Sequence, residues 1–192
     1  MLNCNKIIEI FISLQIIIIS TFIPVYISIP FTNRDIPTFE IPISWQIPSI
    51  IVITLIFNGE IVIKAFSIYL LLGLFFLPVF HNGGSIGYLL TPNFGYLLGI
   101  YPLIKVIDTF KKKYYHKIQF YDFLKYGVLG ICIMHITGIV YNIIQILYFK
   151  QLDTLLYNIS RYSLGKIGYH LLMLTPITLL IKIINKIYRF EK

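Results

Sequence analysis

Long apolar runs, separated by short polar or glycine- and proline-rich stretches, make up most of the 192-residue chain. Apolar runs of about 18 residues or more with few charges are typical of helices that cross a membrane. The pattern predicts six spans, at residues 7–29, 43–57, 61–80, 95–107, 126–149 and 164–187. The second run is short and contains Gln46 and Pro48, which predicts a helix that is tilted or that begins inside the protein.

The connecting stretches differ in character. Residues 32–42 are polar, with two prolines, and residues 58–60 form an Asn-Gly-Glu turn. Residues 81–95 carry four glycines, residues 108–125 are strongly basic, and residues 150–163 are polar and partly amphipathic. We find no repeat and no linker that would divide domains. We therefore expect one domain, residues 1–192, with the all-α fold of a six-helix membrane bundle.

Composition supports this prediction. The chain is 57% hydrophobic and 12% charged, with a mean hydropathy of +0.81, whereas average soluble domains are about 25% charged. Lipid must therefore cover much of the surface. Cys4 and Cys132 fit neither a disulfide framework nor a metal site, and no Walker loop or dinucleotide fingerprint occurs in the sequence. We expect no metal and no cofactor.

The 16 Lys and Arg residues predict the orientation. Six spans place the chain's first residues, residues 58–64, residues 105–125 and its last residues on one side, which then carries 12 of the 16. The positive-inside rule puts this side in the cytoplasm or stroma, with both termini. The net charge of +8 is explained by this bias, so we expect the lipid bilayer as a partner and no nucleic acid.

The segment 81–95 is the first candidate for binding. Glycine- and proline-rich backbone near membrane depth is tolerated only where protein buries it or water reaches it. Transporters use such interruptions to offer backbone groups to a substrate, and Asn82 can both donate and accept. An ordinary outer loop with helix-packing glycines is the alternative.

Gln46 and its neighbour Trp45 are the second candidate. A carboxamide just inside a span either joins helices or contacts a ligand. Trp45 is either an aromatic wall or an anchor at the membrane interface.

Two histidines fall inside predicted spans, His135 in the fifth and His170 in the sixth. Each is a candidate substrate contact or a residue paired with one neighbour. Lys166 and Tyr169, near the trans start of the sixth span, are placed to meet an anionic substrate group. Lys166 alternatively extends to the interface.

Residues 83–87 also fit the Gly-x-Ser-x-Gly pattern of serine hydrolases, with Ser85 as nucleophile. Glycine-rich segments match this pattern by chance, and no other feature indicates catalysis. We expect no catalytic residue and no enzyme activity, so active transport requires an ATP-hydrolysing partner.

Three blocks of sequence resemble the BioY family of biotin transporters. Residues 41–46 (Ile-Pro-Ile-Ser-Trp-Gln) resemble that family's Pro-Ile-Thr-x-Gln, and residues 73–80 resemble its Gly-x-Pro-Val-Phe. Residues 83–99 resemble Gly-Gly-x-x-Gly followed by Gly-Pro-Thr-Gly-Gly-Tyr-x-x-Gly. The blocks occur in the family's order and spacing, and the length and six-helix plan also agree.

The resemblance implies the substrate-binding (S) component of an energy-coupling-factor transporter. Such a component binds biotin from the trans side and works with a transmembrane coupling protein and ATPase subunits. Asn82 and the surrounding Gly83, Gly84, Ser85 and Gly87 would line the pocket near the ureido ring. Gln46 would belong to the pocket wall.

The chain departs from the family at two places. Many members begin the sixth helix with Pro-Gly-Asp-x-x-Lys, whereas residues 167–172 keep only the glycine, with Tyr169 or His170 as substitutes. The first span also lacks the small-x-x-x-small pattern expected for docking the coupling protein. The alternatives are an S component or carrier for another vitamin, such as thiamine or riboflavin, and a membrane scaffold.

The amino-acid composition indicates which membranes could hold the protein. Heavy use of Ile, Lys, Asn, Tyr and Phe with little Ala or Val indicates an A/T-biased genome, as in organelles and some bacteria. We expect the plastid inner envelope membrane or a bacterial cell membrane.

Overall fold

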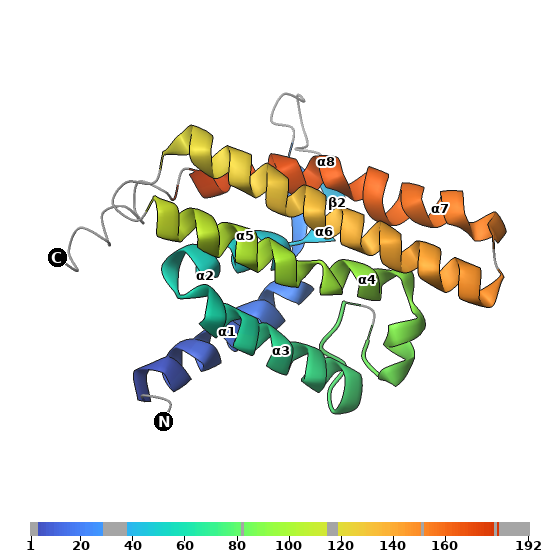
Figure 1. The fold of residues 1–192 in the computed structure, drawn as a ribbon, viewed down its shortest axis with the longest axis horizontal. Coiled ribbons are helices and arrows are strands. Elements are labelled where there is room, and N and C mark those ends of the chain that lie inside the picture. Colours follow the sequence, from blue (N-terminus) through green and yellow to red (C-terminus); the bar gives the residue numbers. More distant parts are fainter. Residues whose placement is uncertain are drawn as a thin grey trace.

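The computed structural model describes residues 4–28, 38–81, 83–114, 119–150, 152–178 and 180. Helices form most of this part of the chain, and one antiparallel hairpin is added to them (Figure 1). The elements are α1 (Cys4–Phe22), β1 (Pro24–Ser28), β2 (Thr38–Ser44), α2 (Gln46–Ile56), α3 (Gly59–Phe75), the 3-10 helix η1 (Ile86–Leu90), α4 (Pro92–Leu98), α5 (Ile100–Lys113), α6 (Phe120–Phe149), the 3-10 helix η2 (Leu152–Thr154), α7 (Leu155–Ile159), the π-helix η3 (Ser160–Leu164) and α8 (Gly165–Leu172).

The first predicted span, residues 7–29, is wrong at its end. The helix stops at Phe22, and residues 24–28 form a strand. Pro24 has no N–H for a helical hydrogen bond, and the Val-Tyr-Ile sequence after it favours a strand. The predicted polar connector is corrected in the same way, because residues 38–42 belong to β2. Residues 32–37 lie outside the described part.

The hairpin is amphipathic. Its register pairs Val25 with Ile41 and Tyr26 with Glu40. Val25, Ile41 and Ile43 are buried together with Met173, which follows α8. The hairpin therefore lies against the end of α8.

Several predicted spans differ from the observed helices at their ends. α3 ends at Phe75 rather than at residue 80, and helix in the fourth span begins at Pro92 and continues to Lys113. α4 and α5 are separate helices that meet at Gly99. The predicted connector 108–125 is therefore mostly helical in its described part, since α6 starts at Phe120. Residues 152–164 are also helical.

α4 and α5 lie against α6, as Figure 1 shows. Glycines bring the helices close: a Cβ at Gly99 would lie 2.5 Å from the carbonyl oxygen of Met134. A Cβ at Gly138 would meet the ring of Tyr96 at 2.4 Å, and one at Gly95 would meet Tyr141 at 2.4 Å. The interface therefore accepts only glycine at these positions without rearrangement.

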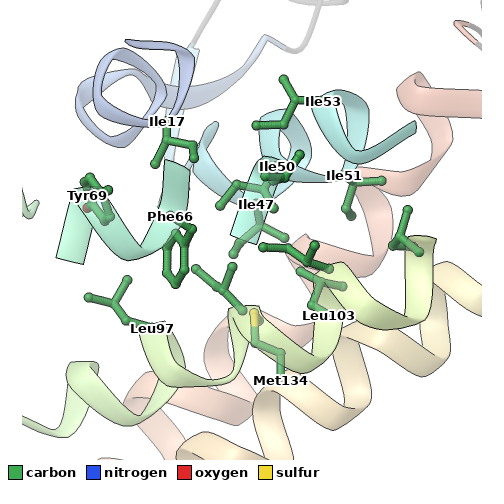
Figure 2. Close-up of a cluster of buried hydrophobic side chains, with 14 of the residues drawn as sticks. Ile17, Ile47, Ile50, Ile51, Ile53, Phe66, Tyr69, Leu97, Leu103 and Met134 are labelled. Atoms are coloured by element: carbon green, nitrogen blue, oxygen red, sulfur yellow. The ribbon is translucent and has the colours of Figure 1, made fainter. Parts of the chain in front are cut away.

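The main core lies between α2, α3, α5 and α6 (Figure 2). α2 is only 11 residues long, and eight of them are buried, including Ile47, Ile50 and Ile51. Phe66 and Tyr69 of α3 and Leu103 of α5 complete the packing around it. The short second helix is therefore buried among its neighbouring helices.

A polar clamp holds the turn between α2 and α3. The backbone N–H of Gly59 donates to Asp108 Oδ1 at 2.9 Å, and Lys111 Nζ donates to the carbonyls of Ile56 and Phe57 at 3.1 and 2.8 Å. Asp108 also pairs with Lys112 at 2.6 Å. The carboxyl end of α5 thus fixes the carboxyl end of α2.

Two described helices, α1 and α6, are long and apolar enough to cross a membrane, and α2 is a shorter apolar helix. Large apolar side chains also face outward on several helices, among them Phe11, Leu71, Phe75 and Leu147. An apolar outer surface on a molecule that already has a packed core is expected where lipid is the solvent.

Replacing Gly99 with Ala should lower thermal stability in detergent, because the new methyl group meets the backbone of α6. Overpacking of this kind destabilises by about 1–3 kcal/mol. Gly168→Ala is the matched control, since a Cβ there has nothing within 4 Å. Equal melting temperatures for the two variants would contradict the close contact at Gly99.

Asp108→Ala should also lower the melting temperature, because Gly59 loses a charge-assisted hydrogen bond worth about 1.5–3 kcal/mol. Lys112→Ala removes only a solvent-exposed partner and should change the melting temperature much less than Asp108→Ala does. If the two substitutions destabilise equally, the ion pair rather than the Gly59 contact holds the turn.

Candidate functional site

A cavity of about 340 Å³ lies where the hairpin, the start of α2, α4, α6 and the last helices meet. Its volume falls within the range of small-molecule sites, about 300–1,000 Å³. The lining residues are Pro24, Glu40, Ile41, Pro42, Ile43, Ser44, Gln46, Ile47, His81, Tyr88, Asn93, Tyr96, Leu97, Ile100, Met134, Arg161, Tyr162, Lys166 and His170.

One wall of the cavity is a row of polar side chains on the last helices. Arg161 and Tyr162 belong to η3, and Lys166 and His170 belong to α8. Lys166 and His170 are four residues apart and so share one helix face. The Arg161 guanidinium contacts the Tyr157 hydroxyl, and Lys166 Nζ lies 5.7 Å from the centre of the Tyr162 ring. Two cations therefore flank one side of the cavity.

The π-helix explains how this row is presented. A π-turn shifts the residues that follow it relative to an α-helix, and such turns often occur at functional sites. Here Arg161 and Tyr162 line the cavity, while Ser163 is buried against α6.

The rest of the lining includes an apolar and aromatic wall. Ile47, Leu97, Ile100 and Met134 supply aliphatic surface. Tyr88 packs on Phe80 with ring centres 4.5 Å apart. Such a wall suits the apolar part of a small ligand.

Gln46 is one of the polar groups in this wall. It is buried, and its Nε2, which lies near the Tyr69 hydroxyl, makes no hydrogen bond of normal geometry among the described residues. A buried amide without a partner carries an energetic penalty that a bound ligand can relieve. Gln46 is therefore a candidate donor to a ligand.

Three buried side chains next to the cavity are joined in a row by hydrogen bonds. Ser163 Oγ lies 3.0 Å from His135 Nδ1, and His135 Nε2 lies 3.0 Å from His170 Nδ1. The ring of Tyr96, which lines the cavity, lies edge-on to His135 with ring centres 5.6 Å apart. The two predicted intramembrane histidines are thus partners of each other, and His170 reaches the cavity.

The glycine-rich segment serves mainly to pack the backbone in its described part. Gly83 has a φ of +101°, which L-residues rarely adopt, and exchanges two 3.0 Å backbone hydrogen bonds with Phe80. A Cβ on Gly84 would lie 2.6 Å from the carbonyl oxygen of Gly73 in α3. These contacts position His81 and Tyr88, which do line the cavity.

The structure brings together only part of the predicted site. Gln46 and His170 line the cavity. Gly83, Gly84, Ser85 and Gly87 are outside the described lining, as are Trp45 and Tyr169, which are 37% and 40% exposed. Asn82 lies outside the described residues, so its predicted role stays a prediction.

Sequence reasoning missed Arg161, Tyr162, Asn93 and Tyr96. The four-residue spacing between Lys166 and His170 was a usable signal for the polar helix face. Extending that face by one turn leads to Arg161 and Tyr162. Tyr96 and Asn93 gave no such signal, because they sit in a stretch that reads as an ordinary span.

Comparison with known proteins gives two matches. The sequence model of the BioY family matches residues 2–184. The chain also resembles a solved structure, the 2.1 Å crystal structure of the S-component for biotin from an ECF-type ABC transporter. The TM-score is 0.61 at 19% identity, over 98% of this chain and 95% of the other. No curated protein sequence matches. The structural match supports the fold, and the family match covers nearly the whole chain.

Proposed function

The chain belongs to the BioY family, and from this premise we propose that it takes up biotin as the S component of an energy-coupling-factor transporter. The observation that carries the proposal is the cavity, whose lining combines two cations with an apolar surface. Biotin has a matching division, with a carboxylate, an aliphatic chain and a polar ureido ring. The similar solved structure is itself an S-component for biotin.

Within this proposal, the carboxylate of biotin meets Lys166 and Arg161. Both line the cavity from the last helices, and cations form the strongest hydrogen bonds to carboxylates. The aliphatic chain and sulfur ring lie against Leu97, Ile100 and Met134. Gln46 Nε2 and Asn93 are placed to bond the ureido group, together with Asn82 as the family resemblance implies.

The chain is an integral membrane protein, and we assign its six spans to α1, α2, α3, the α4–α5 pair, α6 and the helix that starts at α7. With the more basic side in the cytoplasm or stroma, the hairpin, His81 and Arg161 are on the trans side. The cavity lies at that end of the bundle, which supports binding from the trans side. The membrane is a bacterial cell membrane or the plastid inner envelope.

Uptake against a gradient then requires partners that hydrolyse ATP. We propose a transmembrane coupling protein and ATPase subunits, as in the ECF-type ABC transporter from which the similar S-component comes. A second candidate function is an S component for another vitamin. It is favoured by the changed start of the sixth helix, where Tyr169 and His170 stand in place of the family's charged pair.

Thermal unfolding of the detergent-purified protein should distinguish these candidates. Biotin at 100 times its Kd should stabilise the fold by about 2.7 kcal/mol, whereas thiamine and riboflavin should have no effect. A shift with another vitamin and none with biotin would contradict biotin as the substrate. No shift with any of the three would favour a scaffold.

Lys166→Ala should weaken biotin binding by roughly 10- to 100-fold, the expected effect of losing a charge-assisted hydrogen bond. Isothermal titration of the purified protein measures the change. Lys64→Ala, an exposed position on α3 outside the cavity lining, is the control and should bind normally. Biotin methyl ester should be much less sensitive to Lys166→Ala. An equal loss for the ester would show that Lys166 does not meet the carboxylate.

A further inference from the structure

Ser163, His135 and His170 form a row of three hydrogen-bonding side chains that connects α6 with the last helices. They are 2%, 2% and 9% exposed, respectively. Both joining distances are 3.0 Å, the usual length of a hydrogen bond. The outer residue, His170, lines the cavity, and its Nε2 has no hydrogen-bond partner in the described part of the chain.

The hydrogen bonds of this row can run in either of two directions, depending on which nitrogen of each imidazole carries the hydrogen. One hydrogen lies between His135 Nε2 and His170 Nδ1, and a neutral imidazole has one donor and one acceptor nitrogen. If Ser163 donates to His135, then His135 donates to His170, and His170 presents an N–H to the cavity. If the row runs the other way, His170 presents a lone pair.

An acceptor oxygen on the ligand favours the first direction. Lys166 and Arg161 line the same cavity as His170 and can only donate. A ligand group held there is an acceptor oxygen, and a third contact to it must also be a donor. The Ser163 hydroxyl can donate to His135 Nδ1. Each acceptor nitrogen in the row then has a donor, and His170 Nε2–H is left for the ligand.

We propose that Ser163 and His135 are positioning residues that hold His170 as the Nε2–H tautomer, and that His170 donates this hydrogen to an oxygen of the bound ligand. The ligand class is a small carboxylate or carbonyl compound. The proposal rests on the proposed function, with biotin as the specific case.

The same residue types also form Ser–His nucleophilic sites, but the order here is different. A nucleophilic serine must reach the substrate. Ser163 is the innermost of the three and is absent from the described cavity lining. The histidine is the group that reaches the ligand, so the row serves recognition.

Nitrogen NMR of the ¹⁵N-histidine-labelled protein tests the direction of the row. The chain has four histidines, and His81→Asn and His116→Asn identify the other two signals by their loss. The two remaining rings should both be Nε2–H tautomers, and one should shift when biotin is added. An Nδ1–H tautomer for either ring, or no shift at saturating biotin, would overturn the proposal.

Ser163 variants test the positioning role in a second way. Ser163→Ala should bind biotin about tenfold more weakly and give mixed tautomers, since a hydrogen bond is worth about this factor. Ser163→Thr keeps the hydroxyl and should restore both properties. Thr54→Val, which removes a buried hydroxyl on α2 that bonds only its own helix and lies outside the described lining, is the matched control and should bind normally.

The outcomes separate the two proposals. Normal binding by Ser163→Ala, with biotin bound by the wild-type protein, overturns the positioning role and leaves the proposed function intact. No binding by the wild-type protein overturns biotin for both. The tautomers are measured on the wild-type protein. The direction of the hydrogen bonds is therefore determined even if Ser163→Ala is unstable.

Discussion

The contact between Gly99 and the backbone of α6 is the constraint on which the cavity depends. A Cβ at this position would lie 2.5 Å from the Met134 carbonyl oxygen, so α4 and α5 approach α6 as closely as backbone allows. This approach brings Tyr96, Leu97 and Ile100 beside Met134, and together they form the apolar wall. The next residue, His135, is the middle member of the polar row, so this backbone contact positions both the apolar wall and the row.

Much of the helical plan was predictable from the sequence, because apolar runs are the strongest signal in a chain that lipid covers. The hairpin was not predictable in this way. Residues 24–28 are as apolar as the helix before them, and short apolar runs do not distinguish strand from helix. Pro24 and the Val-Tyr-Ile sequence favour a strand locally, but pairing with residues 38–44 is what forms it.

For the site, the sequence draws attention to isolated polar side chains in apolar surroundings, and their role in binding is still a prediction. Gln46 and His170 stood out for this reason, and both line the cavity. The glycine-rich segment was harder to interpret, since glycine allows backbone to approach a ligand or another backbone equally well. At Gly84 the approaching group is the end of α3, which the sequence alone does not reveal. The role of Asn82 within that segment is still a prediction.

The clamp at the far end of α2 has a consequence for the cavity. Lys111 holds the carbonyls of Ile56 and Phe57, and Gln46 begins the same helix at the cavity. α2 is therefore a spacer of 11 residues, about 16 Å long, anchored at the basic end of the molecule. Its length sets both the depth and the direction of the Gln46 amide. One residue more or less would turn that amide by about 100°. The number of residues in α2 is therefore constrained more tightly than the identity of its apolar side chains.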